Sequence, residues 1–447
     1  MKFAWVRVAS LVLAFSSIPA EEADARWPQW RGPHANGIAA ATELQTTWSR
    51  GNNVKWIAPL PAWAGSTPVV WGKRIFLVSP SAGKPKSESN DPETGDDARP
   101  DRRATLGPRS NPGGSELMLL ALSREDGAVL WQRELDSGNR LHRKDNEASP
   151  SPVTDGRHVW AVTGTGVVSA FDMDGDKVWS RDLQEAFGPF GLKFGYSSSP
   201  LLHDDVLIVQ VLHGTNTDDP SYIVALDAHT GETRWRHERE TDALAESPDA
   251  YTTPALLKVD GKSQVIISGA DYVTAHDVKT GAELWRAAGL NPEKRKNYRV
   301  VGSPVVVDGV IYAPTRQRPL LALRPGGELL WKFEGSAAPD VPTPVSDGKY
   351  VYMIDDKGLA SCLDAKTGKT VWGPERTTVG TVSASPILAA GKIYIVNENA
   401  VTTVLKAGPE FGILATNELD GSYTLSSPVA VGSQLLIRTG THLYCIE

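Results

Sequence analysis

Basic side chains that could bind an anion are concentrated in a few short segments of an acidic chain. The formal net charge of the 447 residues is −7. The candidate ligand-contacting residues are Arg140, His142, Arg143, Lys144, Lys294, Arg295, Lys296, Arg299, Arg316 and Arg318. Clustered cations raise the local concentration of anions, so the pattern predicts a binding site for an anionic ligand. The alternative is solvated loop charge, partly neutralised by Asp242, Glu246 and Asp249.

Motifs for catalysis or metal binding are weak by comparison. Asp172, Asp174 and Asp176 alternate as in the start of a calcium-binding loop, but the glutamate required further along is missing. We therefore interpret them as a turn. The sequence contains no G-x-S-x-G, H-E-x-x-H or C-x-x-C-H motif. We predict no catalytic residue and no metal ligand from these patterns.

The basic segments lie between copies of a repeated hairpin. In YIVALDAHTGETRW, residues 222–235, apolar and polar residues alternate, a polar turn ends at Gly231, and a second strand carries Trp235. This is the pattern of an antiparallel hairpin. The hairpin recurs with a tryptophan at the same offset, at Trp131, Trp179, Trp235, Trp285, Trp331 and Trp372. In a seventh, degenerate copy the tryptophan position falls on Ala415.

A second marker recurs in step with the hairpins. A Ser-Pro or Thr-Pro pair precedes each pair of apolar runs, and proline suits the first position of a strand. The pairs begin at Thr67, Ser151, Ser199, Thr253, Ser303, Thr343, Ser385 and Ser427. Each repeat thus contains four antiparallel strands, and repeated four-stranded units of this length predict a β-propeller. The eight markers predict an all-β fold of eight blades.

The last repeat lacks its fourth strand. Residues 52–60 can supply it from the N-terminal side, because Trp56 occupies the place of the repeat tryptophan. We predict that this strand completes blade eight, closes the ring and removes the exposed edges. The propeller then spans residues 44–447.

The intact A-x-D-x-x-T-G-x-x-x-W pattern, from Ala225 to Trp235, resembles the pyrroloquinoline-quinone (PQQ) repeat. The resemblance implies the eight-bladed fold that quinoprotein dehydrogenases share with the BamB outer-membrane assembly factor. It implies either of two functions. The first is a non-catalytic scaffold that binds a protein or an anionic small molecule on its loop face, and that needs no cofactor. The second is a PQQ-dependent alcohol or sugar dehydrogenase with calcium.

The dehydrogenases of this family hold the quinone against a ring of two adjacent disulfide-bonded cysteines. This chain has only Cys362 and Cys445, both aligned with the small residue Ala225. Equivalent positions two blades apart lie beyond the reach of a disulfide, so we predict two buried free thiols. The comparison favours the scaffold. We expect a monomer that neither binds nucleic acid nor spans a membrane.

The N-terminal 43 residues divide into two segments. Residues 1–25 combine Lys2 and Arg7 with a short apolar stretch and small residues, which predicts a signal peptide cleaved after residue 20 or 25. No cysteine lies near these sites, so we expect a periplasmic or secreted protein without a lipid anchor. Residues 26–43 are predicted to form a clasp that packs its tryptophans against the propeller and stabilises the closure. The alternative is that Trp27, Trp30 and Arg31 stack on one another or on a ligand.

Residues 80–115 interrupt blade one. They are rich in Pro, Gly, Ser and charge and have few large apolar groups, so they predict a flexible insertion between the second and third strands. In a propeller that loop lies on the same face as the connections between blades. A mobile flap over the binding face and an insertion without a role are both consistent with the composition.

Overall fold

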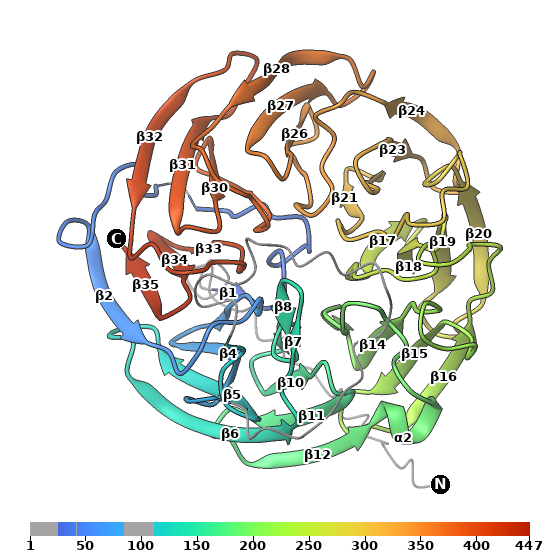
Figure 1. The fold of residues 1–447 in the computed structure, drawn as a ribbon, viewed down its shortest axis with the longest axis horizontal. Coiled ribbons are helices and arrows are strands. Elements are labelled where there is room, and N and C mark those ends of the chain that lie inside the picture. Colours follow the sequence, from blue (N-terminus) through green and yellow to red (C-terminus); the bar gives the residue numbers. More distant parts are fainter. Residues whose placement is uncertain (1–25, 42, 85–110) are drawn as a thin grey trace, which may run out of the picture.

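A computed structural model describes residues 26–41, 43–84 and 111–447, and these form a closed ring of eight sheets around a central axis (Figure 1). The predicted signal peptide and most of the predicted insertion lie outside the described residues. Seven sheets have four antiparallel strands and one has a fifth strand added. The predicted eight-bladed, all-β propeller is therefore confirmed.

In blades one to seven the four repeat strands run outward from the axis in chain order, and in blade eight the first three do. The innermost strands are β3 (Val69–Trp71), β9 (Val153–Thr154), β13 (Leu201–His203), β17 (Ala255–Val259), β21 (Val305–Val307), β25 (Val345–Ser346), β29 (Ile387–Ala389) and β33 (Val429–Val431). The second strands are β4 (Arg74–Pro80), β10 (His158–Val162), β14 (Val206–Val211), β18 (Lys262–Gly269), β22 (Val310–Ala313), β26 (Tyr350–Ile354), β30 (Lys392–Val396) and β34 (Gln434–Arg438).

The outer half of each blade contains the repeated hairpin. The third strands are β5 (Glu116–Ser123), β11 (Val167–Asp172), β15 (Tyr222–Asp227), β19 (Tyr272–Asp277), β23 (Leu320–Leu323), β27 (Leu359–Asp364), β31 (Val401–Lys406) and β35 (His442–Ile446). The outermost strands are β6 (Val129–Ser137), β12 (Lys177–Asp182), β16 (Thr233–Glu238), β20 (Glu283–Ala288), β24 (Leu329–Phe333), β28 (Thr370–Arg376), β32 (Ile413–Glu418) and β2 (Val54–Pro59).

The antiparallel order places the connections on two opposite faces. The turns between strands one and two and between strands three and four lie on one face. The loops between strands two and three lie on the other, together with the connections from one blade to the next. We call this second face the loop face. A short hairpin of β7 (Leu141–His142) and β8 (Asp145–Asn146) and the helix α2 (Leu183–Phe187) lie within inter-blade connections.

The turn of the repeated hairpin is stabilised by its own hydrogen bonds. In blade three the Asp227 carboxylate accepts from the backbone N–H groups of His229 and Thr230, at 2.9 and 3.0 Å. Gly231 follows with φ +74° and donates its N–H to the Asp227 carbonyl at 2.8 Å. An aspartate that caps its own turn and a glycine with positive φ thus fold the hairpin locally.

The turn glycine has a second role in packing neighbouring blades. The Trp235 ring of blade three lies directly against Gly281 of blade four, where an added Cβ would lie 2.4 Å from the indole. The Trp235 indole N–H also donates to the Val278 carbonyl at 3.0 Å. The same contact of a tryptophan with the next blade's turn glycine recurs for Trp56 on Gly127, Trp131 on Gly175, Trp179 on Gly231, Trp285 on Gly327 and Trp331 on Gly368.

The repeat tryptophans are less buried than a core residue. Trp56 and Trp331 are 8% exposed, whereas the other five are half-buried because one edge of each ring faces solvent. Opposite each tryptophan on the third strand stands a small residue, such as Ala225 opposite Trp235. Cys362 and Cys445 occupy this position in blades six and eight, and both are buried free thiols.

The Ser-Pro and Thr-Pro markers form a ring of hydrogen bonds around the axis. In each blade the backbone N–H of the marker residue donates to the side-chain hydroxyl oxygen of the marker in the next blade. The donor–acceptor pairs are Thr67–Ser151, Ser151–Ser199, Ser199–Thr253, Thr253–Ser303, Ser303–Thr343, Thr343–Ser385, Ser385–Ser427 and Ser427–Thr67. The distances lie between 2.8 and 3.2 Å, and the last pair closes the circle. We call this set the hydroxyl ring.

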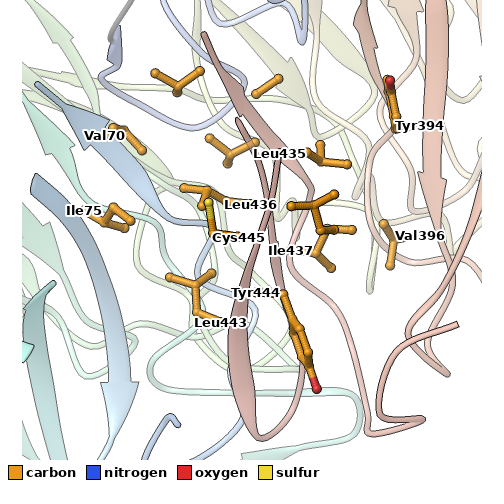
Figure 2. Close-up of a cluster of buried hydrophobic side chains, with 14 of the residues drawn as sticks. Val70, Ile75, Tyr394, Val396, Leu435, Leu436, Ile437, Leu443, Tyr444 and Cys445 are labelled. Carbon is orange, nitrogen blue, oxygen red and sulfur yellow. The ribbon is translucent and has the colours of Figure 1, made fainter. Parts of the chain in front are cut away.

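The N-terminal strand completes blade eight as predicted. Strand β2 pairs antiparallel with β35, and Trp56 stands opposite Cys445. Figure 2 shows the buried core at this closure, with Val70 and Ile75 of blade one on one side of blade eight and Tyr394 of blade seven on the other. The outermost strand of the last blade therefore comes from the beginning of the described chain.

Trp48 occupies the place of the tryptophan missing from blade seven. Its ring stacks on Tyr394, with centroids 6.4 Å apart, and is 5% exposed. In blade six Tyr352, on the equivalent strand, contacts the repeat tryptophan Trp372 at the same centroid distance but with a tilted ring. The Trp48 backbone N–H donates to the Asn417 side chain on β32 at 2.9 Å, which fixes the segment beside the degenerate strand. A residue distant in sequence thus compensates for Ala415.

The segment around β1 (Arg26–Trp27) crosses the central channel on the side opposite the loop face. Strand β1 pairs with β3, and the backbone of Ile38 bridges that of Leu388 in blade seven. Arg31 is 1% exposed and donates to the carbonyls of Pro344 and Pro386, both at 2.6 Å. This burial lowers the pKa of Arg31 to about 9. The segment closes one end of the channel.

Among the residues that the structure describes, no helix is long and apolar enough to cross a bilayer.

Candidate functional site

A cavity of about 300 Å³ opens on the loop face at the centre of the propeller. All eight residues of the hydroxyl ring line it, and the half-buried indole of Trp30 contributes from the N-terminal segment. Because Trp30 belongs to the segment that closes the channel, its indole lies at the inner end of the cavity. Apolar side chains of Phe194, Tyr251 and Leu425 also face this space.

Inter-blade connections supply most of the charged side chains of the cavity wall. The β7–β8 hairpin brings His142, Arg143, Lys144 and Asp145 over the axis, from the connection between blades one and two (Figure 1). The connection between blades four and five brings Arg299. A wall assembled from several blades can contact a ligand from different sides.

Phe194 is the centre of a cluster of cations beside the cavity. The guanidinium carbons of Arg143 and Arg299 lie 5.4 and 5.1 Å from its ring centroid, and the Lys193 ammonium lies at 5.5 Å. The Phe194 backbone N–H donates to the Tyr251 hydroxyl at 3.1 Å, which helps to hold the ring. Arrangements of this kind are attractive because the face of an aromatic ring carries partial negative charge.

Two further cations of the wall are paired with buried glutamates. Lys144 Nζ lies 3.0 Å from the Glu398 carboxylate and 3.3 Å from the Ser383 hydroxyl. His142 Nε2 lies 2.8 Å from the Glu147 carboxylate, which raises the pKa of His142 above its ordinary value despite the opposing effect of burial. These pairs fix the position of the β7–β8 hairpin over the channel.

Three aspartates face the same cavity. Asp145 lines the cavity, and desolvation raises the pKa of its carboxyl to about 7. The pKa of Asp356 is raised to about 6, first by desolvation and then by the charge of Asp340. Desolvation also raises the pKa of Asp340, although Arg299 and Arg316 oppose the shift. The wall therefore becomes more positive as the pH falls.

These shifts predict a pH dependence of stability. The pKa of Asp145 is higher in the folded protein than its ordinary 3.8, so the folded state binds the proton more tightly. The stabilisation is complete below about pH 4 and is lost as the pH rises through about 7. We expect the melting temperature to fall across this range, and Asp145→Asn to reduce the fall. A variant with an unchanged slope would contradict this assignment.

The structure brings half of the predicted ligand-contacting residues to the cavity. His142, Arg143, Lys144, Arg299 and Arg316 line it. The other candidates lie further out on the loop face. Three of them form ion pairs: Arg140 with Glu147, Lys294 with Asp242 and Asp271, and Arg295 with Glu293. Arg295 and Arg318 border a separate recess beside Tyr298. Lys296 is exposed.

Sequence reasoning missed the acidic and aromatic parts of the site. Asp145 directly follows the basic residues His142, Arg143 and Lys144, and this position was the one sequence signal for it. Asp356 lies in a short polar turn like many others in the chain. Phe194 is one of several aromatic residues in the connection between blades two and three, and Tyr251 lies in the next connection, so their proximity depends on how neighbouring blades pack.

One group of side chains in the described part of the chain has the composition of a metal site, and it lies away from the cavity. Ligand atoms of His237, His276 and Glu283 come within 4.8 Å of one another between blades three and four. Both His276 ring nitrogens already have hydrogen-bond partners, and Glu283 pairs with Arg286 at 2.8 Å. These contacts account for the group as part of the blade packing.

The comparisons with known proteins point in two directions. The family model described as outer membrane protein assembly factor BamB matches residues 115–372 and 320–423, which is more than half of the chain. Outer membrane protein assembly factor BamB of Yersinia pestis is 26% identical over 338 residues, covering 72% of this chain and 78% of that protein. The alcohol dehydrogenase (quinone) dehydrogenase subunit of Gluconobacter oxydans is 35% identical, but over only 22% of this chain and 16% of that subunit.

Solved structures of both kinds share the fold. BamB from Moraxella catarrhalis aligns with a TM-score of 0.55 and 17% identity, over 74% of this chain and 94% of that chain. A europium-containing methanol dehydrogenase aligns with a TM-score of 0.67 and 12% identity, over 95% and 91%. Together with the family match, the eight repeats identify this chain as a member of the PQQ-like repeat family described as outer membrane protein assembly factor BamB.

Proposed function

We propose that this protein is an exported, non-catalytic propeller scaffold that binds a partner or ligand on its loop face. The observation that carries the proposal is the cavity, which is closed at its inner end and lined by cations from several blades. Pockets in which a few polar groups converge within an apolar lining are the usual form of a ligand site. The BamB relatives support a scaffold, since the match covers most of both chains.

A capture experiment tests this proposal. The tagged protein is expressed in its host, and proteins retained from the exported fraction are identified for wild type and for two charge reversals. Arg143→Glu changes the loop face, whereas Lys258→Glu changes an exposed residue of β17. We expect Lys258→Glu to retain the partner and Arg143→Glu to lose it. Equal retention by both variants would contradict binding through the loop face.

The second candidate, a PQQ-dependent dehydrogenase, is favoured by the three aspartates that face the cavity. A calcium ion in the cavity would need ligands that converge there. In the described ranges, the group that combines three His, Cys, Asp or Glu ligands lies between blades three and four instead. Cys362 and Cys445 are buried in separate blades, so they do not form the cysteine pair of the dehydrogenases. The residues present do not fit this cofactor arrangement.

We therefore expect no quinone-dependent turnover. The assay incubates purified protein with PQQ and calcium and follows dye-linked oxidation of a panel of alcohols and aldoses. Weak uptake of PQQ alone is consistent with the cationic wall, because PQQ is a tricarboxylate. Stoichiometric uptake together with turnover above the protein-free control would replace the scaffold proposal with the enzyme.

A further inference from the structure

The cation cluster at Phe194 has fewer acidic partners than charges. Lys193 and Arg299 share one carboxylate, that of Glu246, at 3.4 and 2.9 Å. Across residues 26–41, 43–84 and 111–447, no carboxylate lies within ion-pair distance of Arg143. Three cations around one aromatic ring are therefore matched by one paired carboxylate. Two further acids act on the cluster without an ion pair to Arg143. Asp249 accepts hydrogen bonds from Thr215 and the Lys193 backbone, and Asp340 interacts with Arg143 and Arg299 through longer-range charge.

The two arginines of this cluster have donors to spare. A guanidinium carries five N–H donors in a planar fork that fits a carboxylate or phosphate. The hydrogen bond found for the Arg299 side chain is the one to Glu246, while Arg143 contacts the Phe194 face. Both arginines line the cavity, whereas Lys193 does not. Their remaining donors are therefore available to a group that enters the cavity.

The location of Arg143 and Arg299 favours a small ligand over a protein partner that presents a flat surface. Arg143 is exposed at the cavity mouth, but the Arg299 side chain is only 12% exposed. A ligand must enter the cavity to reach both. Beyond the arginines the wall combines the hydroxyl ring with the apolar groups of Tyr251, Val301 and Leu425, and the Trp30 indole lies at the inner end. An anionic head with an apolar or aromatic body matches this order of groups.

We propose that Arg143 and Arg299 anchor the carboxylate or phosphate head of a small organic anion whose body extends toward Trp30. This inference rests on the binding function proposed above. The contacts with Phe194 position both guanidinium groups, and Glu246 accepts the hydrogen bond found for Arg299. The hydroxyl ring surrounds the body, and its oxygens each accept one backbone N–H, so their hydroxyl protons remain available to polar groups of the ligand.

The test titrates the full purified chain with phenylacetate, phenyl phosphate and neutral benzyl alcohol by calorimetry. We expect one or both anions to bind and benzyl alcohol to bind at least tenfold more weakly, and the tighter anion identifies the head group. Arg143→Gln and Arg299→Gln should each weaken binding by about tenfold or more, the loss typical of a charged hydrogen-bond partner. Lys296→Gln, an exposed basic residue on the same face, should change it less than twofold.

Arg143→Lys is a second kind of variant, which keeps the positive charge but removes the planar, forked set of guanidinium donors. We expect it to fold like wild type, by circular dichroism and melting temperature, and still to weaken binding severalfold. Benzyl alcohol binding as tightly as the anions, or unchanged affinity in both glutamine variants, would overturn the anchor. So would the absence of binding by every probe at 10 mM. The capture experiment with the host fraction uses none of these probes, so its outcome judges the scaffold proposal separately.

Discussion

Deleting residues 1–60 should abolish the soluble, folded protein. The deletion removes β2 (Val54–Pro59), which pairs with β35 along its whole length. It also removes Trp48, which packs on Tyr394 of blade seven, and the segment that closes the channel. Without them the ring has an open edge strand and an exposed core, which together favour aggregation. Soluble yield and size-exclusion elution measure the effect.

Two shorter deletions serve as controls. A chain beginning at residue 26 keeps every described element and should behave like the complete propeller. A chain beginning at residue 44 loses β1 and Arg31 but keeps Trp48 and β2, so we expect a soluble ring of lower melting temperature. A chain of residues 61–447 that is soluble and as stable as residues 26–447 would refute closure by the N-terminal strand.

Trp235→Ala should lower the free energy of unfolding by about 3 kcal/mol, the lower end of the range for removing a large aromatic residue from a core. The lower end applies because one edge of the ring faces solvent. The substitution removes both the packing on Gly281 and the hydrogen bond to the Val278 carbonyl. Trp235→Phe keeps part of the packing and loses the hydrogen-bond donor, so we expect its free energy of unfolding to lie between those of wild type and Trp235→Ala. Denaturant unfolding gives both values.

A double-mutant cycle with Gly281→Ala isolates the contact between the blades. In wild type the substitution has two costs: the new methyl group clashes with the Trp235 indole, and alanine is strained at the positive φ of this position. In the Trp235→Ala background only the strain from the positive φ remains. Gly281→Ala should therefore cost less in the Trp235→Ala background. An unchanged unfolding midpoint for Trp235→Ala, or strictly additive effects in the cycle, would show that this contact is not what joins the blades.

The fold was predictable because its determinants are local and repeated. The aspartate and glycine of each turn fold one hairpin, and Trp235 with Gly281 sets the contact to the next blade. Repetition then specifies the ring. Trp48 could not be predicted in this way, because its role depends on a residue missing from blade seven, far away in the sequence. Neither could the hydroxyl ring, since the same Ser-Pro pairs are explained equally well as strand starts.

The candidate site was predictable only in part, for the opposite reason. Basic segments identified the connections that approach the axis, so Arg143, Lys144 and Arg299 were found. Propeller geometry then separates residues that are close in sequence: Lys296 is exposed, three positions before the recessed Arg299. The aromatic ring of Phe194, which brings the arginines together, carries no charge or motif that would single it out.

Site-specific photo-crosslinking in the host cell tests the central claim, binding through the loop face, most directly. A photoreactive residue replaces either Lys296 on the loop face or Asp260 in the turn between β17 and β18 on the opposite face, both exposed. Irradiation should yield a discrete crosslinked product from position 296 and none from position 260. Introducing Arg143→Glu should remove that product. A discrete product from position 260 alone would contradict the account and place the binding surface on the opposite face.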